Sequence, residues 1–317
     1  NEFQREFGDI AVNLDQAEGR ELVEAFLDTE PNRLGLPFRD MLYRQTHGHP
    51  LFTIELLRGM EERGDLVHDP EGRWVEGSAL DWETLPARVE AVIAERMGRL
   101  PEPLQDMLRA ASVEGEVFTA EVLAQVQAAD EREIIHHLSG ELTRQHRLVT
   151  AQSLQRVGSQ HLSRYRFRHF LFQKYLYSHL DPVERAHLHE AMGNLLEALY
   201  RERVAAGDVL ELGAQFPPVA EGAVQLARHF QAAGILDKAA EYRLHAGIRA
   251  NLLSAAEEAV AHFKQGVALL QTLPDSPERA EQELTLQNAL ANTLKSIRAS
   301  TDPEVVRVHA RIQELCE

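Results

Sequence analysis

Apolar residues along this chain recur at intervals of three and four positions, and few segments alternate with a period of two. That spacing places the apolar side chains on one face of an α-helix, so the chain is predicted to be mainly helical. In the segment that begins at Pro50, Leu51, Ile54 and Leu57 share such a face. Proline suits the first turn of a helix, and Gly64 suits its end.

The pattern divides the chain into three predicted domains. Residues 1–98 form a compact helical unit with a small hairpin, whose turn is Asp69-Pro70-Glu71-Gly72. Residues 99–180 have the order of a winged helix, with three helices followed by two strands. Residues 181–317 are helical throughout and are predicted to form an α-solenoid of tetratricopeptide-like hairpins.

The middle domain has recognisable helix starts. Thr119 is predicted to cap its second helix, and Asp130 with Glu133 forms a capping box for its third. The strands are expected around Leu148–Thr150 and Tyr165–Phe167, with a polar loop over residues 152–163 between them. The predicted β-structure of this domain is therefore a two-stranded wing.

The last domain opens with Asp181-Pro182, which combines a helix cap with a first-turn proline. The buried stripe of that helix is predicted to be Leu188, Met192, Leu195 and Leu199. Small and aromatic residues then follow tetratricopeptide-like offsets; they are Ala227, Phe230, Ala239, Ala246, Ala259, Phe263 and Gly266. The two halves start twenty residues apart rather than ~34, so an irregular array is expected.

Composition indicates where in the cell this protein is expected to lie. The 317 residues contain no apolar run near the ~20 residues of a membrane helix, and no signal-peptide pattern is present. The single Cys316 excludes a disulfide within the chain and fits a cytoplasmic location. Because the chain begins at Asn1 rather than Met, we expect it to be a fragment of something longer.

Charge is distributed unevenly. The net charge of −17 disfavours nucleic acid as a general partner, because the phosphate backbone would be repelled. From Arg144 to Leu180, however, there are seven basic residues and no Asp or Glu. Such segregation calls for a bound anion, a nucleic acid, or an acidic face elsewhere in the same molecule.

Motifs for independent catalysis are missing from the sequence. It contains no G-x-x-x-x-G-K-[ST], no G-x-G-x-x-G and no H-E-x-x-H. Histidine pairs occur at 47/49, 136/137 and 187/189, but their spacing does not supply the three or four ligands of a metal site. We therefore predict no metal and no catalysis by this chain alone.

Two strings carry a family resemblance. Residues 46–52, Thr-His-Gly-His-Pro-Leu-Phe, with Glu-Leu-Leu at 55–57, resemble the T-x-G-N-P-L-F-x-x-E-L-L stretch of the signal-transduction ATPases with numerous domains. These are relatives of the AAA+ and apoptotic-protease-activating ATPases and include maltose-regulator-like transcription factors. Residues 165–171, Tyr-Arg-Phe-Arg-His-Phe-Leu, resemble the string, often R-F-x-H-D-L-L, that ends the family's winged helix.

The resemblance implies a nucleotide site shared with an absent domain. Gly48 and Pro50 would line the base end of that site at the helical lid, which is then residues 1–98. His169 matches the histidine that contacts the β-phosphate of ADP in relatives with an M-H-D motif, and Arg168 lies beside it. ADP or ATP would bind only with the missing P-loop domain, which would be an intramolecular partner of this chain.

Three functions are therefore weighed. The favoured one is the regulatory and sensing part of a nucleotide-switched signalling ATPase, whose helical repeats bind a protein or small-molecule effector. The second is a winged-helix DNA-binding regulator, although Asp130, Glu131, Glu133 and Glu141 would place acidic groups near DNA phosphates. The third is a helical-repeat scaffold with no nucleotide role. The alternative is a purely structural role for both strings: Gly48-His49-Pro50 is then only a connection between helices, and His169 is an interior histidine.

Overall fold

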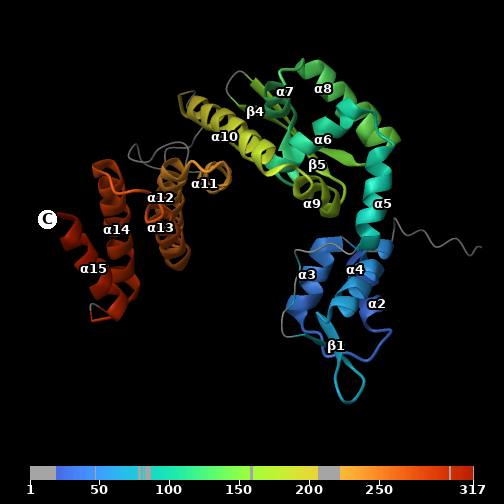
Figure 1. Cartoon of the computed structure of the whole chain (residues 1–317), viewed down its shortest axis with the longest axis horizontal. Coiled ribbons are helices and arrows are strands. Elements are labelled where there is room, and N and C mark those ends of the chain that lie inside the picture. Colours follow the sequence, from blue (N-terminus) through green and yellow to red (C-terminus); the bar gives the residue numbers. More distant parts are fainter. Residues whose placement is uncertain are drawn as a thin grey trace, which may run out of the picture. The chain divides into compact units, whose positions relative to one another are not determined.

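The chain is mainly helical, with one sheet of two strands and one of three in the residues that are described (Figure 1). The computed structural model describes residues 19–46, 48–77, 80, 82, 87–157, 160–205, 222–299 and 301–316. The mainly helical class predicted from the sequence is confirmed. None of the helices in these ranges has the length and apolar content needed to span a membrane.

The chain forms two compact units. The first holds the residues up to Leu108 together with Phe167–Ser178, and the second holds Arg109–Arg166 together with the residues from His179 onward. The second unit thus contains the three-stranded sheet, apart from Phe167 at the end of its last strand, and the C-terminal helices. The division into domains 1–98, 99–180 and 181–317 stays a prediction.

Short helices and a hairpin build the first unit. Its elements are α2 (Gly19–Leu27), α3 (Leu36–Thr46), α4 (Pro50–Arg63), β1 (Leu66–His68), β2 (Trp74–Glu76), α5 (Ala87–Gly98) and α9 (Phe170–Ser178). The apolar core of α2, α3 and α4 includes Val23, Leu27, Phe38, Leu42, Leu56 and Met60. Helix α9 comes from much later in the sequence and packs against α3 and α5.

The predicted hairpin is present, because β1 and β2 pair antiparallel. Asp69 closes the turn: its Oδ1 accepts hydrogen bonds from the backbone N–H groups of Glu71 at 3.0 Å and Arg73 at 2.9 Å. Gly72 follows with a φ of 77°, which glycine adopts without strain. Helix α4 ends at Gly64 as predicted, with a left-handed φ of 80°.

The middle of the chain carries a three-stranded sheet rather than a two-stranded wing. Its elements are α6 (Glu102–Glu114), β3 (Val117–Thr119), α7 (Ala120–Val126), α8 (Glu131–His137), the π-helix η1 (Leu138–Gln145), β4 (Val149–Val157) and β5 (Gln160–Phe167). The strand order is β3-β5-β4, and β3 pairs antiparallel with β5. Neither β3 nor the π-helix was predicted.

The predicted loop over residues 152–163 is also wrong, because β4 and β5 occupy most of it. The residues there are mostly polar, and Leu154, one of the few apolar ones, is 66% exposed. The apolar residues of this stretch do not alternate regularly with polar ones, so the hydrophobic pattern gave no sign of the strands.

The two predicted caps of this region behave differently. Asp130 caps α8 as expected, since its Oδ1 accepts from the backbone N–H of Arg132 at 2.9 Å and of Glu133 at 3.2 Å. Thr119 precedes α7 but does not cap it with its side chain. Its hydroxyl instead donates to Oε1 of the buried Glu114 at 2.9 Å.

Helix α10 (Pro182–Ala205) begins where predicted, with Oδ1 of Asp181 accepting from the backbone N–H of Val183 at 2.8 Å. Its buried face differs from the prediction. Met192 is buried, but the predicted Leu188, Leu195 and Leu199 are only half-buried. The other buried positions of this face include His189, Gly193, Leu196 and Glu197.

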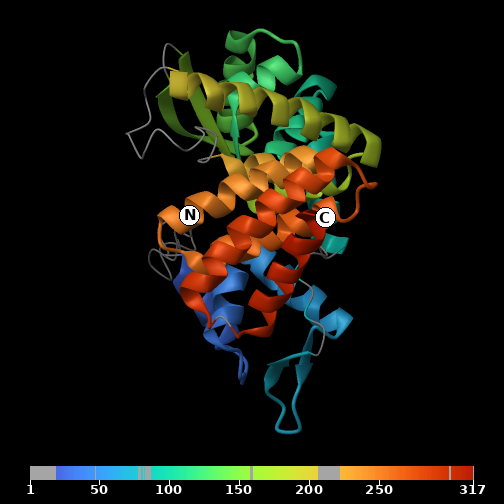
Figure 2. The same cartoon turned by 90° about the vertical axis from the view of Figure 1, so that its left-hand side faces the viewer.

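The C-terminal helices pack one after another. They are α11 (Ala223–Ala232), α12 (Leu236–Leu252), α13 (Ala256–Leu270), α14 (Pro277–Ile297) and α15 (Pro303–Cys316). Each contacts the next, and α12 also contacts α14 (Figure 2). The residues at tetratricopeptide-like offsets lie at these contacts; Ala227, Phe230, Ala239, Ala246, Ala259 and Phe263 are all buried. A repeat solenoid stays a prediction.

Candidate functional site

The turn between α3 and α4 is held by two threonine hydroxyls. Thr46 Oγ1 donates to the carbonyl of Leu42 at 2.9 Å and accepts from Thr53 Oγ1 at 3.0 Å. The backbone N–H of Gly48 also donates to Thr46 Oγ1, at 3.3 Å. Both threonines are buried, so this small network fixes how the chain leaves α3 and enters α4.

Gly48 occupies a position that no other residue fits. Its φ is 71°, and a Cβ built there would lie 2.3 Å from the Cα and the carbonyl oxygen of Gly19. The turn therefore lies directly against the start of α2, backbone on backbone. Pro50 then takes the first turn of α4.

The two motif strings meet at a pair of histidines. The rings of His49 and His169 have centroids 4.8 Å apart and stand nearly perpendicular, at 84°. Phe52 of α4 packs against both rings, with centroids 4.4 Å from His49 and 5.2 Å from His169. A hundred and more residues of sequence separate these histidines, yet both lie in the first compact unit.

Phe172 and Arg96 extend this group, which we call the histidine cluster: His49, Phe52, Arg96, His169 and Phe172. The Phe172 ring lies 5.9 Å from His169 and 6.2 Å from Phe52, centroid to centroid. The guanidinium of Arg96 on α5 lies 5.4 Å from the Phe172 ring centroid, within range of a cation–π interaction. The cluster is thus positioned by the helices α4, α5 and α9 and by the junction between β5 and α9.

The surroundings of His49 favour its neutral form. Burial, together with the positive charge of Arg96, lowers the pKa of His49 below its ordinary value. Its Nδ1 is buried, and it has no hydrogen-bond partner among the residues that the structure describes. A neutral imidazole can donate its N–H to an anionic ligand, and a neighbouring arginine can donate to the same ligand.

The predicted site residues fall into two groups. Gly48, Pro50 and His169 are brought together in or beside the cluster. Arg168 is exposed, on the bend between β5 and α9, and no described residue is seen to pair with it. His47 lies outside the described residues.

Sequence reasoning assigned no role to Phe52, Arg96 and Phe172. A signal for two of them existed, because each histidine is followed by phenylalanine three positions later: Phe52 after His49, and Phe172 after His169. That spacing is typical of side chains on one helix face. No pattern in the sequence relates α5, which carries Arg96, to the helices that carry these phenylalanines. The place of Arg96 in the cluster therefore could not be predicted.

The basic window meets acidic groups of its own unit. Arg166 Nε lies 3.7 Å from Oε1 of Glu116, and both side chains are partly exposed. Arg164 is close enough to Glu114 to stabilise its charge. Burial nevertheless dominates and raises the pKa of Glu114 to about 7.

In the described ranges, no group of three or more His, Cys, Asp or Glu side chains that could hold a metal ion is found, and the absence of a metal stays a prediction. His137 Nδ1 contacts Glu141 Oε1 at 2.7 Å. His187 is exposed, whereas His189 is buried and its Nδ1 lies 2.9 Å from Nδ1 of His229 on α11.

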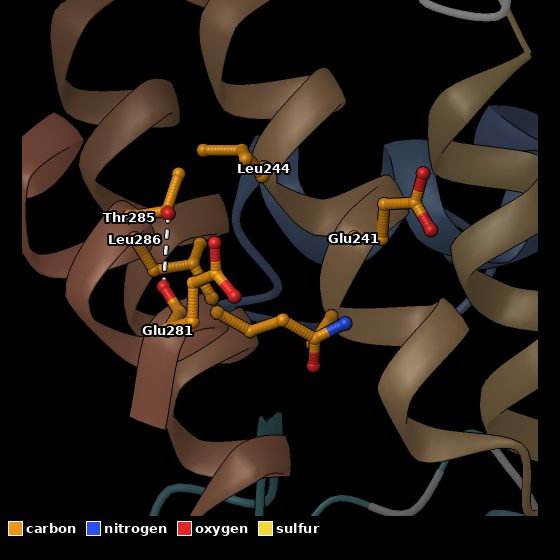
Figure 3. A pocket seen from close by; sticks show the side chains of 7 residues that line it. Glu241, Leu244, Glu281, Thr285 and Leu286 are labelled. Atoms are coloured by element: carbon orange, nitrogen blue, oxygen red, sulfur yellow. Dashed lines mark hydrogen bonds between the residues drawn. The ribbon is translucent and has the colours of Figure 1, made fainter. Parts of the chain in front are cut away.

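A cavity of about 260 Å³ lies between α12 and α14 (Figure 3). Ala240, Leu244 and Leu286 provide its apolar lining. Glu241 and Glu281 stand at its edge, and both are exposed. The hydroxyl of Thr285 donates to the Glu281 backbone carbonyl at 2.9 Å, so it is already satisfied (Figure 3).

Comparisons with protein-family models, curated proteins and solved structures found no match for this chain.

Proposed function

We propose that this chain is the regulatory and sensing part of a nucleotide-switched signalling ATPase. Residues 1–98 would be the helical lid, residues 99–180 the winged helix, and the C-terminal hairpins the part that binds an effector. The nucleotide, ADP or ATP, would be held jointly with a P-loop domain that this chain does not contain. The chain alone would not hydrolyse ATP.

One observation carries the proposal: the imidazole of His169 packs on His49 of the lid turn, with ring centroids 4.8 Å apart. The resemblance assigned both strings to a single nucleotide site, and the two lie together in one compact unit. The neutral state of His49 and the cation of Arg96 suit a site that receives a phosphate.

The proposed switch needs only a difference in affinity. If the arrangement in which His169 reaches the nucleotide binds ADP about a hundredfold more tightly than the alternative, the difference is ~2.7 kcal/mol. That is enough to bias a two-state equilibrium toward the closed state. An effector bound to the C-terminal hairpins would oppose this bias if it binds the open state more tightly than the closed state.

DNA binding has less support. Two arginines of the basic window, Arg164 and Arg166, face the acidic groups Glu114 and Glu116. Helix α8, which would have to read the DNA, carries Glu131 and Glu133 in its first turn. Internal charge pairing therefore accounts for part of the window without a nucleic acid.

The proposal requires that this chain belong to a longer protein with a P-loop domain, and the test compares the two. That domain should contain a G-x-x-x-x-G-K-[ST] motif, and the longer protein should bind ADP in isothermal titration, whereas this chain alone should not. Absence of that motif from the complete gene product, or failure of the longer protein to bind ADP, would contradict the proposal.

A further inference from the structure

A second cavity, of about 300 Å³, lies among α13, α14 and α15 and is separate from the one in Figure 3. Its apolar wall includes Val267 on α13, Leu290 on α14 and Val308 on α15. All three are buried side chains of the C-terminal core. Six of the ten lining residues are polar or charged, so a cavity of this size fits a small organic molecule that has both an apolar and a polar part.

Gln287 is a polar residue of the cavity lining. Its side chain is on α14 and only 5% exposed. The amide Oε1 is buried, and no hydrogen-bond partner for it exists in the described part of the chain. An unsatisfied buried acceptor is energetically unfavourable, so a bound N–H or O–H donor would relieve that penalty.

The rim of the cavity is positively charged. Lys264, Arg307 and Arg311 line it with a single carboxylate, Glu304. Lys264 pairs with Glu304, and Arg311 donates to both carboxylate oxygens of Glu283, at 2.7 and 3.0 Å. These two cations are therefore neutralised within the protein.

Arg307 differs from the other two cations. It is exposed on α15, and no ion pair or hydrogen bond to it is found among the described residues. An unpaired guanidinium at the mouth of this cavity is suited to grip a carboxylate with two parallel hydrogen bonds. In a chain with a net charge of −17, this rim is a local exception that attracts anions.

We propose that this cavity binds a small organic carboxylate with an apolar body and an N–H donor. Arg307 holds the carboxylate, Gln287 Oε1 accepts the N–H, and Val267, Leu290 and Val308 cover the hydrocarbon. One free cation and an apolar wall match a monoanion better than a phosphate, which demands more donors. The site goes beyond the proposed nucleotide switch and does not depend on it, because binding is measured without nucleotide.

The test uses N-acetyl-L-leucine, which presents a carboxylate, an amide N–H and a branched hydrocarbon. Titration of the full chain is compared with N-acetyl-L-leucinamide, which lacks the charge, and isocaproate, which lacks the N–H. We expect N-acetyl-L-leucine to bind about tenfold or more tightly than either, a difference of ~1.4 kcal/mol. Absence of saturable binding, or equal affinity for all three, would overturn the proposal.

Two variants locate the site. Arg307→Gln should weaken N-acetyl-L-leucine binding about tenfold, while Lys295→Gln, which removes the same charge from an exposed position of α14, should leave it unchanged. Gln287→Leu should abolish the preference over isocaproate while keeping isocaproate binding. Equal weakening by the Arg307 and Lys295 variants would indicate a general charge effect and refute the assignment.

Discussion

The backbone of Gly48 lies against the backbone of Gly19 so closely that a methyl group on Gly48 would sit 2.3 Å from the Gly19 carbonyl oxygen. This contact joins the turn before α4 to the start of α2. It explains why the Gly48-His49-Pro50 string has glycine first: both its φ of 71° and the space available exclude a side chain. The position of His49 in the histidine cluster depends on that turn.

Gly48→Ala is expected to destabilise the protein strongly. The left-handed φ alone costs a non-glycine residue about 1–2 kcal/mol, and the backbone clash adds to it. Gly72→Ala is the matched control, because Gly72 has a φ of 77° and no atom within 4 Å of its Cβ position. Urea unfolding should therefore show a clearly larger loss for Gly48→Ala, and equal losses would refute the close approach.

The buried pair of His189 and His229 predicts loss of stability in acid. Burial and Arg228 lower the pKa of His189 to about 4 and of His229 to about 2. As the pH falls from about 6.5 toward 4, these two histidines bind protons in the unfolded chain but stay largely unprotonated in the folded chain. The free energy of unfolding should then fall, by at most about 1.4 kcal/mol per pH unit for each histidine.

The measurement is chemical unfolding of the wild type and His229→Gln at several pH values between 7.5 and 4.5. The variant has no side chain to protonate at position 229, so its stability should depend less steeply on pH. His136→Gln is the control, since His136 is exposed. Parallel pH curves for the wild type and His229→Gln would contradict the role assigned to the pair.

Glu114 predicts the opposite pH effect. Its pKa is raised to about 7 by burial, and Thr119 donates to it through both its backbone N–H and its hydroxyl, each at 2.9 Å. As the pH rises from about 4.5 to 7, the unfolded chain loses this proton before the folded chain does. The contribution of Glu114 to the free energy of unfolding should therefore fall over that window, by roughly 3 kcal/mol.

Glu114→Gln should remove this pH dependence, because an amide offers Thr119 the same oxygen acceptor and an N–H donor for its hydroxyl. The variant is expected to be more stable than the wild type at pH 8 and similar to it at pH 4.5. Thermal unfolding at the two pH values checks this, with Glu62→Gln at an exposed position of α4 as the control. A variant less stable than the wild type at pH 8 would refute the prediction.

Tyr242 links α12 to α10 through a buried carboxylate. Its hydroxyl donates to Oε1 of Glu197, whose Oε2 lies 2.9 Å from Lys238 Nζ. Tyr242→Phe should lower the free energy of unfolding by about 1–3 kcal/mol, because a charged acceptor loses a buried donor. A double-mutant cycle with Glu197→Gln measures the coupling, and a coupling energy near zero would mean that this hydrogen bond does not stabilise the helix contact.

The sequence predicted the elements whose causes are local. Asp69 and Gly72 define their turn within four residues, Gly64 ends α4 through its own backbone, and Asp130 caps α8 through adjacent N–H groups. Each needs no partner from elsewhere in the chain. Such features can be read from one short string at a time.

Elements that depend on contacts with residues far away in the sequence were not predicted. Strand β3 is three residues long and exists because β5 pairs with it. The buried face of α10 includes His189 and Glu197, which become acceptable only beside His229 and Tyr242 from later helices. For the candidate site, the sequence indicated His169 and the turn before α4 separately, and only the family resemblance joined them.

The most direct test of the nucleotide switch is the ADP affinity of the longer protein when His169 is replaced. We expect His169→Gln to weaken ADP binding by about tenfold or more, ~1.4 kcal/mol, while His68→Gln, at an exposed position of β1, leaves it unchanged. Thermal unfolding of the protein without ADP should confirm that both variants are folded. Equal ADP affinity of the wild type and His169→Gln would contradict the proposed role of His169 in the switch.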